Sequence, residues 1–357
     1  MSSLNPFKDI PAILTAEEII EYAHKHSKKL SMKSSYQLPK VDRTRIREVA
    51  RLQEFVKLVK TKLKQIVEEF PSLDNLHPFY MELAEILVGI DKLKRSLGAV
   101  YNCIGPINSI ADNHLEAIKL SKDYKQMKWS RSAAKGRIAS IVESTSENID
   151  FIIHAKTTLS KLPGILPDSP TIVCAGFPNV GKSTLVRQVS TAEPEIAYYP
   201  FTTKKVIIGH LKIGEHLVQI VDTPGVLDRP MSKRNYIEKQ AITALKYLAD
   251  VIVFLIDPSE ACGWNIKDQM GLLNEVRRTF PLVPTLTAFN KVDITPEDKL
   301  KEAHELLPNV YEISALSGEG VGVLLRDATG EVDVKTMDEA IEEYLESIKK
   351  GNPNPFD

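Results

Sequence analysis

The sequence predicts two architectures in one chain, an all-α helical bundle followed by an α/β domain with a mostly parallel sheet and helices on both faces. Three observations support this. Apolar residues recur at helical spacing in the first part, short apolar runs alternate with helical patterns in the second, and the proline-rich stretch LPGILPDSP separates the two. We therefore expect the bundle at 1–161, a linker at 162–170, the α/β domain at 171–350 and a tail at 351–357.

The composition is that of a folded protein and excludes several classes. The 357 residues are 43% hydrophobic and 26% charged, with a formal net charge of −1. They contain no run of about 18 apolar residues, and the start, MSSLNPFKDIPAILTAEE, lacks the features of a secretory signal. The three cysteines stand far apart, as in proteins of reducing compartments. We expect a cytoplasmic protein that does not bind a membrane.

Apolar residues at alternating steps of three and four predict the helices of the bundle. One such series covers 49–70 and the next covers 79–100. We expect these two helices to form an antiparallel pair, joined by the turn PSLDNLHP. Two further helices, at about 107–129 and 132–160, would complete a bundle of long helices.

The bundle carries an excess of positive charge. Residues 1–165 hold 26 Lys and Arg against 19 Asp and Glu, whereas the rest of the chain holds 20 against 28, so the bundle is the candidate for contact with a polyanion. Basic residues at steps of three would wind around one helix as a ribbon, which with Trp129 is typical of a surface that follows a phosphate backbone and stacks on an unpaired base. A solvated face, with Trp129 packed against a neighbouring helix, is the alternative. The candidates for RNA contact are Lys119, Lys122, Lys125, Lys128, Trp129, Arg131, Lys135 and Arg137.

Short apolar runs predict the strands of the α/β domain. Helical patterns separate most of these runs, which favours parallel pairing through helix crossovers. The segment KIGEH around Gly214 is too short for a crossover, so we expect a tight hairpin and one antiparallel pair there. The expected strands lie at about 171–175, 204–211, 216–222, 251–257, 284–290 and 309–314.

A phosphate-binding loop follows the first of these strands. The sequence GFPNVGKS matches G-x-x-x-x-G-K-S and leads into a helical pattern, which is the strand–loop–helix context that the motif requires. Glycines let the backbone approach closely, so that its N–H groups bind phosphate oxygens at a helix N-terminus. Lys182 would reach the outer phosphates, and the Ser183 hydroxyl would bind Mg²⁺. The loop residues expected to bind nucleotide are Gly176, Phe177, Pro178, Asn179, Val180, Gly181, Lys182, Ser183 and Thr184.

Two further segments are expected near the outer phosphate. Asp222-Thr-Pro-Gly225 ends an apolar strand. Its carboxylate can hold Mg²⁺ through a water molecule, and the glycine lets a backbone N–H meet a γ-phosphate. Between the two motifs lies Tyr199-Pro-Phe-Thr202-Thr203. A switch threonine there would ligate Mg²⁺ only when a γ-phosphate is present, and the spacing leaves open which of the two threonines does so.

The sequence Asn290-Lys291-Val-Asp293 predicts that the base is guanine. Guanine presents two neighbouring donors, N1–H and an exocyclic amine, which the single carboxylate of Asp293 can accept together, and adenine presents no such pair. Asn290 would either bond the O6 and N7 side of the base or brace the loops, while the Lys291 stem would cover the ring face. After the last strand, Ser314, Ala315 and Leu316 would direct the Ala315 N–H toward the guanine O6.

The segments GFPNVGKST, YPFTT, DTPG, NKVD and SAL resemble the Obg group of GTPases. The stretch DRPMSKRNYIEKQAITALKYLADVIVFLIDPSEACGW at 228–264, with NPFKDIP near the start, resembles the Nog branch, the nucleolar GTP-binding protein family, in its short archaeal form. The resemblance covers about residues 5–320. It implies a P-loop GTPase domain, a bundle that binds rRNA, and a role in assembly of the large ribosomal subunit. By alignment with YPFTT, it also implies that Thr203 is the magnesium ligand and Thr202 its neighbour.

Hydrolysis of the γ-phosphate is expected to be slow. Lys182, Thr203 and Gly225 are the expected catalytic residues, but Val226 stands where Ras-like proteins carry the glutamine that orients the attacking water. Related GTPases with an asparagine at the position of Asn179, and without that glutamine, use K⁺ as a positive charge beside the phosphates. We therefore hypothesise K⁺ as a second cation beside Mg²⁺. The alternative is that Asn179 only braces the loop.

Two functions remain open from the sequence. The leading one is a slowly hydrolysing GTP switch, a monomer away from the ribosome, which contacts rRNA or a precursor particle through its bundle. The alternative is a nucleotide-regulated protein–protein interaction module without direct RNA binding, whose bundle docks another helical protein or dimerises. Roles of the glycine-rich domain of bacterial Obg proteins and of the charged C-terminal extension of eukaryotic Nog proteins are not carried over to this sequence. The acidic segment at 336–349 is expected to form the last helix of the GTPase domain.

Overall fold

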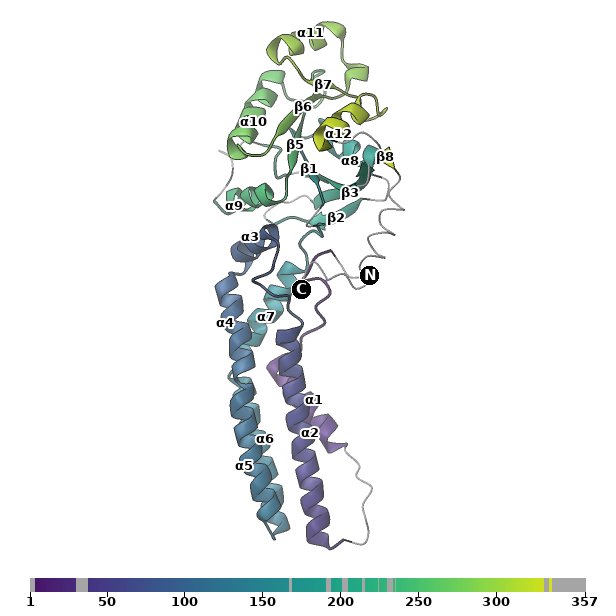
Figure 1. The fold of residues 1–357 in the computed structure, drawn as a ribbon. Coiled ribbons are helices and arrows are strands. Elements are labelled where there is room, and N and C mark those ends of the chain that lie inside the picture. Colours follow the sequence, from purple (N-terminus) through teal and green to yellow (C-terminus); the bar gives the residue numbers. More distant parts are fainter. Residues whose placement is uncertain are drawn as a thin grey trace. The chain divides into compact units, whose positions relative to one another are not determined.

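A computed structural model gives the structure of the chain, with its elements shown in Figure 1. Close contacts divide the chain into two compact units. We call residues 7–73 and 88–159 the helical unit, and residues up to Pro6, 74–87 and those from Ser160 onward the sheet unit. The structure describes residues 4–29, 38–166, 169–190, 194–200, 205–213, 216–223, 225–229, 234, 236–330 and 334–335.

The helical unit is organised around its longest described helix, α2 (Lys40–Glu68). Helices α1 (Ala16–Lys28), α4 (Ile90–Asn102), α5 (Ile104–Leu120) and α6 (Tyr124–Glu143) all pack against it, and α7 (Ser146–Leu159) packs against α4. The apolar series predicted at 49–70 lies on α2, where Leu52, Phe55, Val59 and Leu63 are fully buried. Because burial of each such side chain contributes roughly 1.5–3 kcal/mol, this series forms the core of the unit.

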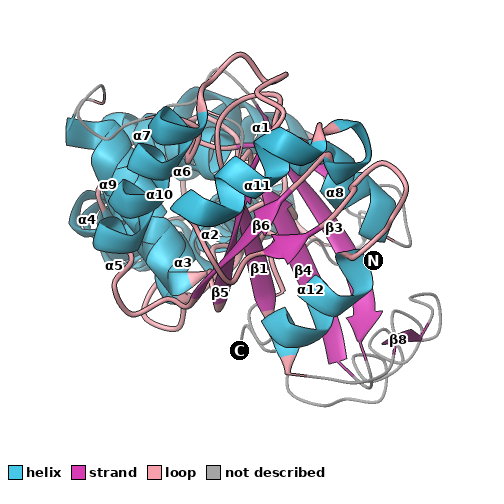
Figure 2. Cartoon of the chain, turned by 90° about the horizontal axis from the view of Figure 1, so that it is seen from above, coloured by secondary structure: helices cyan, strands magenta, loops and turns pink. Residues whose placement is uncertain are grey.

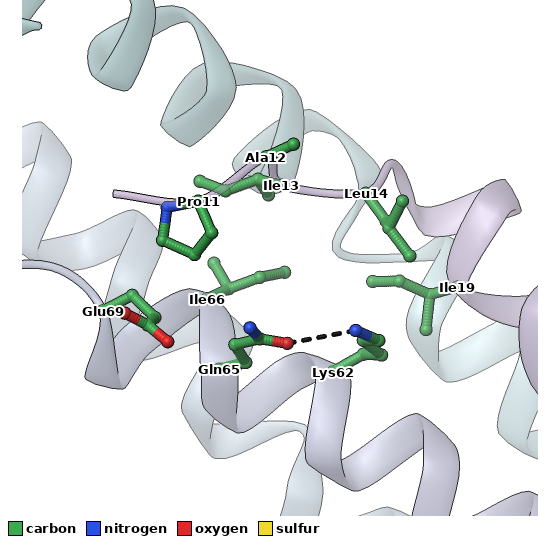
Figure 3. Close-up of a pocket in the computed structure, with 9 residues that line it drawn as sticks. All are labelled: Pro11, Ala12, Ile13, Leu14, Ile19, Lys62, Gln65, Ile66 and Glu69. Carbon is green, nitrogen blue, oxygen red and sulfur yellow. Dashed lines mark hydrogen bonds between the residues drawn. The ribbon is translucent and has the colours of Figure 1, made fainter. Parts of the chain in front are cut away.

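The segment that precedes α1 lies along α2. Helix α1 begins with a capping box, in which the Thr15 hydroxyl accepts from the Glu18 N–H and the Glu18 carboxylate accepts from the Thr15 N–H. A cavity of about 20 Å³ lies between residues 11–14 and α2. Figure 3 shows the side chains that line it, among them Lys62, which donates to the Gln65 side chain. That volume holds about one water molecule, so the cavity is not a ligand site.

The single helix expected at 79–100 is wrong. The chain forms α3 (Pro78–Leu87) and then α4, because Gly89 between them has a φ of +77°, a left-handed conformation that cannot continue a helix. The periodicity missed this break because the apolar spacing continues across it. Helix α3 also leaves the bundle in which it was expected, and packs in the sheet unit against α9 (Tyr236–Ala244).

The basic run does not wind around one helix, so the predicted ribbon is wrong. The helix expected at 107–129 ends with α5, and α6 begins after a short turn. In this turn the Ser121 hydroxyl accepts from the Asp123 N–H, and the Asp123 carboxylate caps α6 by accepting from the Lys125 N–H. Likewise, the helix expected at 132–160 is divided between α6 and α7. The basic residues therefore extend across the turn between α5 and α6.

The sheet unit contains a sheet with the strand order β2-β3-β4-β1-β5-β6-β7, and β8 pairs with β3. Strand β1 (Thr171–Ala175) is parallel to both β4 (His216–Asp222) and β5 (Val251–Ile256), and β6 (Thr285–Phe289) and β7 (Tyr311–Glu312) continue in parallel. As expected for the hairpin, β3 (Lys205–Ile213) is antiparallel to β4. The sequence did not predict β2 (Glu195–Tyr198) or β8 (Val334–Lys335). The helix expected at 336–349 lies outside the described residues.

Helices flank this sheet, as predicted. Figure 2 shows them around the strands. They are α8 (Lys182–Val189), α9, α10 (Ile266–Thr279), α11 (Glu297–Leu306) and α12 (Val321–Thr329), with short 3-10 turns at Leu245–Tyr247 and Val292–Ile294. Because the central strands are parallel, the segments that follow β1, β4, β5, β6 and β7 meet at one edge of the sheet. Crevices at this edge are where open α/β sheets bind ligands.

Tyr80 on α3 joins three separate segments of the sheet unit. Its buried hydroxyl accepts from the Ile165 N–H at 3.1 Å and lies 2.8 Å from the Pro163 carbonyl oxygen and 3.1 Å from that of Leu4. Burial raises the pKa of this phenol above its usual value, so the hydroxyl keeps its proton. One side chain of α3 thus connects this helix to both the linker and the N-terminal segment.

We predict that Tyr80→Phe lowers the stability of the sheet unit by about 1–3 kcal/mol, because it leaves the Ile165 N–H buried without its acceptor. Urea unfolding followed by Trp264 fluorescence measures this in a Trp129→Phe background, since these are the two tryptophans of the chain. Tyr101→Phe, at a half-exposed position, is the control. Equal midpoints for the two variants would contradict the anchoring role.

Candidate nucleotide-binding site

The loop after β1 has the backbone of a phosphate-binding loop. Gly176 has a φ of +131°, and a Cβ there would lie 2.5 Å from the Leu255 carbonyl oxygen. Gly181 has a φ of +106° and precedes α8, and a Cβ on it would lie 2.1 Å from Nδ2 of Asn290. Both positions therefore require glycine, for conformation and for space. The open N-terminus of α8 follows directly, where N–H groups bind anions.

Lys182 stands at the first turn of α8 with its ammonium group over the loop. Its Nζ donates to the carbonyl oxygens of Gly176 and Phe177, both at 2.8 Å, and the side chain is buried. Asn179 lies exposed at the tip of the loop with a φ of +65°, which asparagine tolerates better than most residues. Phe177 stacks on Trp264, with ring centroids 4.3 Å apart.

The structure brings Ser183 and Asp222 together. The Ser183 hydroxyl donates to Oδ2 of Asp222, which is fully buried at the end of β4. A hydroxyl and a carboxylate are the hard oxygen donors that Mg²⁺ prefers, so these two residues fit the predicted ion. The third expected ligand, Thr203, and its neighbour Thr202 lie outside the described residues. The preceding Tyr199 is buried, and its hydroxyl donates to the Ala241 carbonyl oxygen at 2.6 Å.

Gly225 is engaged in contacts that the sequence did not reveal. Its N–H, predicted to face a γ-phosphate, donates to Oδ2 of Asp228 at 2.7 Å. Buried Arg234 donates to the Gly225 carbonyl oxygen at 2.9 Å and lies 3.7 Å from the Asp228 carboxylate. Val226 and Leu227 are buried, so neither side chain is available to orient a water molecule. No local motif marks Asp228 or Arg234, because their roles depend on contacts across a turn.

A pocket of about 210 Å³ lies where the base is expected. Within it, Asn290 acts as a brace: its Nδ2 donates to the Val180 carbonyl oxygen at 2.7 Å, and its Oδ1 accepts from the Ala315 N–H at 2.8 Å. Of the two roles that the sequence left open for Asn290, the structure contains the brace. The Ala315 N–H, expected to face the guanine O6, is bonded to this brace, so a contact with the base stays a prediction. The lining residues are Gly181, Thr184, Asn290, Lys291, Asp293, Ile294, Ser314, Ala315 and Leu316.

Asp257, at the end of β5, is a positioning residue that sequence reasoning missed. Its fully buried carboxylate accepts from the Lys291 ammonium at 2.6 Å and from the N–H groups of Ser259 and Cys262. Lys291 has a φ of +64°, and this ion pair holds it in place beside Asp293. The available signal was an acidic residue at the end of the apolar run VIVFLI.

The cysteines of the sheet unit do not supply a nucleophile. Burial, together with the charge of Asp222, raises the pKa of the Cys174 thiol, and burial likewise raises that of Cys262. Both thiols are therefore protonated at neutral pH, and a protonated thiol is a poor nucleophile. Within the described residues, no group of three or more His, Cys, Asp and Glu has the arrangement of a metal centre.

The RNA-contact candidates divide into two groups. Lys119, Lys122, Lys125, Lys128 and Arg137 are exposed, and Trp129 is 69% exposed, so the alternative of a packed tryptophan is wrong. Leu120 and Tyr124 are also exposed beside them. We call residues 119–129 the α5–α6 surface. In contrast, Lys135 is buried, and Arg131 is partly buried in an ion pair with Glu48 at 2.7 Å.

Comparisons with known proteins decide the family. Residues 7–165 match the family model described as the NOG1 N-terminal helical domain, and residues 236–293 match that of nucleolar GTP-binding protein 1 (NOG1). An uncharacterized protein of Methanocaldococcus jannaschii is 38% identical over 298 residues, which cover 83% of this chain and 83% of that protein. The chain belongs to the NOG1 family. The resemblance to the Nog branch is confirmed.

Eukaryotic members of the NOG1 family are longer. Nucleolar GTP-binding protein 1 of Drosophila melanogaster is 33% identical over 96% of this chain but 52% of its own length. The protein of the same name from Saccharomyces cerevisiae is 28% identical over 96% of this chain and 53% of its own length. This chain thus spans about half the length of these relatives. A crystal structure of a nucleolar GTP-binding protein 1 from Plasmodium falciparum matches 53% of this chain and 97% of that chain, at 33% identity with a TM-score of 0.40.

The expectation of a cytoplasmic protein is contradicted, because the Drosophila, yeast and Dictyostelium relatives are named nucleolar. The cysteine pattern could not distinguish the two compartments, because the cytosol and the nucleus are both reducing. In the part of the chain that the structure describes, no helix has the length and apolar character needed to cross a membrane.

We predict that Asp293→Asn lowers the affinity for GDP about ten- to a hundredfold, since an amide cannot accept both donors of guanine and a charged hydrogen bond contributes about 1.5–3 kcal/mol. Xanthosine diphosphate, whose base carries an acceptor in place of the amine, should bind the variant better than the parent. Titration with fluorescent analogues measures both affinities. Asp298→Asn, exposed on α11, is the control, and an unchanged affinity for GDP in Asp293→Asn would contradict the assignment of the base.

Proposed function

We propose that this protein is a slowly hydrolysing GTP switch in the assembly of the large ribosomal subunit, and that its helical unit contacts rRNA or a precursor ribosomal particle. The observation that carries the proposal is the Asn290 brace, which joins the phosphate-binding loop to a pocket lined by Asp293. The naming of the relatives as nucleolar GTP-binding proteins supports both GTP and a ribosome-related role.

The phosphate end of the site is proposed to work through charge. The Lys182 ammonium would turn from its two carbonyl acceptors toward the β- and γ-phosphate oxygens. Ser183 and Asp222 would hold Mg²⁺, with Asp222 acting through a water molecule and Thr203 as a further ligand. A bound Mg²⁺ would supply positive charge that offsets the negative charge of the outer phosphates.

Asp228 gives the switch its off state in this proposal. The Gly225 N–H has one hydrogen to donate, and Asp228 accepts it at 2.7 Å. A γ-phosphate oxygen that accepts from the same N–H must displace the Asp228 carboxylate, and the two negative charges also repel each other. Since Arg234 contacts both Gly225 and Asp228, the exchange would move these three residues together and present a different surface to a partner.

We predict slow turnover, on the order of 10⁻³ s⁻¹ or below without an activator, because intrinsic rates are of this order even where a glutamine orients the water, and buried Val226 and Leu227 cannot do so. If K⁺ acts beside the phosphates through Asn179, turnover in KCl should exceed turnover in NaCl at equal ionic strength, and Asn179→Ala should remove the difference. Phosphate release assays measure the rates. Identical rates in the two salts would exclude K⁺ as a cofactor, leaving Asn179 as a loop residue.

The α5–α6 surface is proposed to contact RNA. Replacing Lys122, Lys125 and Lys128 by Glu should weaken binding to large-subunit rRNA fragments and reduce its salt dependence, because each phosphate contact that is lost lowers the number of counterions released. Trp129→Ala should weaken binding to unpaired segments by about 1–3 kcal/mol for a stacked base. Filter binding across a salt series measures both effects.

The control replaces three lysines that are exposed elsewhere on the helical unit, Lys25 on α1 and Lys57 and Lys64 on α2, by Glu. Equal losses in the control and in the α5–α6 variants would show that only net charge matters. A concentration-dependent dimer without RNA affinity would instead favour the protein–protein interaction module.

Crosslinking on precursor large subunits, with a non-hydrolysable GTP analogue or with GDP, tests the switch, and equal binding in both states would contradict it.

A further inference from the structure

The helical unit contains a basic cavity that the nucleotide site does not use. Its volume is about 440 Å³, and its walls come from α1, α2 and α6, which pack against one another. Figure 1 shows these helices in the same unit. The volume falls in the range of small-molecule pockets, about 300–1,000 Å³. The lining residues are His24, Ser27, Lys28, Arg51, Arg131, Ser132, Lys135 and Gly136.

Positive charge in the cavity exceeds the negative charge that balances it. Four cationic side chains line the walls, and one carboxylate, that of buried Glu48, lies beside them. Glu48 forms an ion pair with Arg131 at 2.7 Å and accepts a hydrogen bond from Nε of Arg47 at 3.2 Å. Among the residues that the structure describes, Lys28, Arg51 and Lys135 have no carboxylate partner.

The burial and the pKa of Lys135 show that this arrangement of cations is unfavourable. It is 8% exposed, its Nζ donates to the Ser27 hydroxyl at 2.7 Å, and it lies 4.5 Å from the centre of the Phe55 ring. Burial, followed by the charges of Arg131, Arg51 and Lys28, lowers its pKa to about 8. Burial and neighbouring cations, Lys135 first among them, also lower the pKa of His24. The positive charge inside the cavity is therefore only partly compensated, by Glu48.

Two of the donor groups near the cavity also lack hydrogen-bond acceptors among the described residues. The Nε atoms of Arg51 and Arg131 are buried and have no hydrogen-bond partner within the described part of the chain. An unpaired buried donor on a charged group is unfavourable, and an anion would satisfy several such donors at once. At Gly136, a Cβ would meet nothing within 4 Å, so the missing side chain leaves the cavity open.

We propose that this cavity binds a phosphate group, either of a small phosphorylated molecule or of an RNA backbone. Phosphate provides the charge and several acceptors in one compact group, and planar guanidinium groups match its geometry. The phosphate would lie between Arg51, Arg131 and Lys135, with Ser132 at the rim. The inference does not depend on the proposed GTP switch, because these residues belong to the helical unit.

Isothermal titration of the full chain with inorganic pyrophosphate tests the proposal. The protein is first loaded with GDP and Mg²⁺ and then desalted, so that its phosphate-binding loop is occupied. The parent should bind pyrophosphate and show a higher Tm in its presence, as expected for a ligand of the folded state. Arg51→Gln and Lys135→Gln should each weaken binding by at least about tenfold, the loss of one charged hydrogen bond.

Gly136→Leu places an apolar side chain at the wall of the cavity while every charge stays in place, and it should weaken binding at least about tenfold. Gly105→Leu is the matched control, because Gly105 also lies in a helix with open space at its Cβ. Far-UV circular dichroism verifies that each variant is folded. The absence of binding in the parent, a Tm shift that NaCl reproduces at equal ionic strength, or full binding by both Gly136→Leu and Lys135→Gln would overturn the proposal.

Competition identifies the source of the phosphate. If a single-stranded RNA displaces pyrophosphate and Gly136→Leu weakens RNA binding, the ligand is a backbone phosphate. If pyrophosphate binds in the presence of RNA, and Gly136→Leu leaves RNA affinity unchanged, the ligand is a small phosphorylated molecule.

Discussion

The side chain of Asn290 holds the nucleotide site together. Its amide links the phosphate-binding loop, through the Val180 carbonyl, to the segment after the last strand, through the Ala315 N–H. Asn290 is buried, so these hydrogen bonds are protected from water. The Asn290 side chain approaches the Gly181 backbone so closely that this position must be glycine. The two ends of the site, one for phosphate and one for base, are therefore held at a fixed separation by one residue and its glycine neighbour.

The side proposed for the γ-phosphate differs from the base side. There the contacts of Gly225 are with Asp228 and Arg234, which follow it within one short segment, and not with another strand. Hydrogen bonds of this kind can be exchanged for a ligand without disturbing the sheet. In the proposed switch, the base end would thus bind GDP and GTP alike, and the γ-phosphate end would report which of the two is bound.

The sequence predicted the motifs of the site better than the helices of the bundle, for a physical reason. Each motif is a local strand–loop segment, and parallel strands must bring their ends to one edge, so the position of Asp222 or Asn290 follows from the topology. Helix breaks are different. The apolar spacing through 79–100 continues across Gly89, and periodicity does not report a left-handed φ. Nor does it report which neighbour an apolar face meets, so α3 was expected in the bundle. Asp228 was missed because its partners lie across a turn, and Asp257 because its partner Lys291 follows another strand.

The spacing of the basic residues likewise does not report which of them are buried, although the apolar residues of α6 indicate it. Along α6 the buried positions are Met127, Ser130, Ala134, Lys135, Ile138 and Val142, so Lys135 lies on the apolar face and Arg131 lies one turn before it. A charged residue on the buried face of a helix needs a partner, and the one carboxylate nearby, Glu48, is already shared by two arginines. The spacing of the lysines indicates only the exposed side of the run. The burial pattern points instead to its inner residues, where a bound anion would complete the packing of three helices.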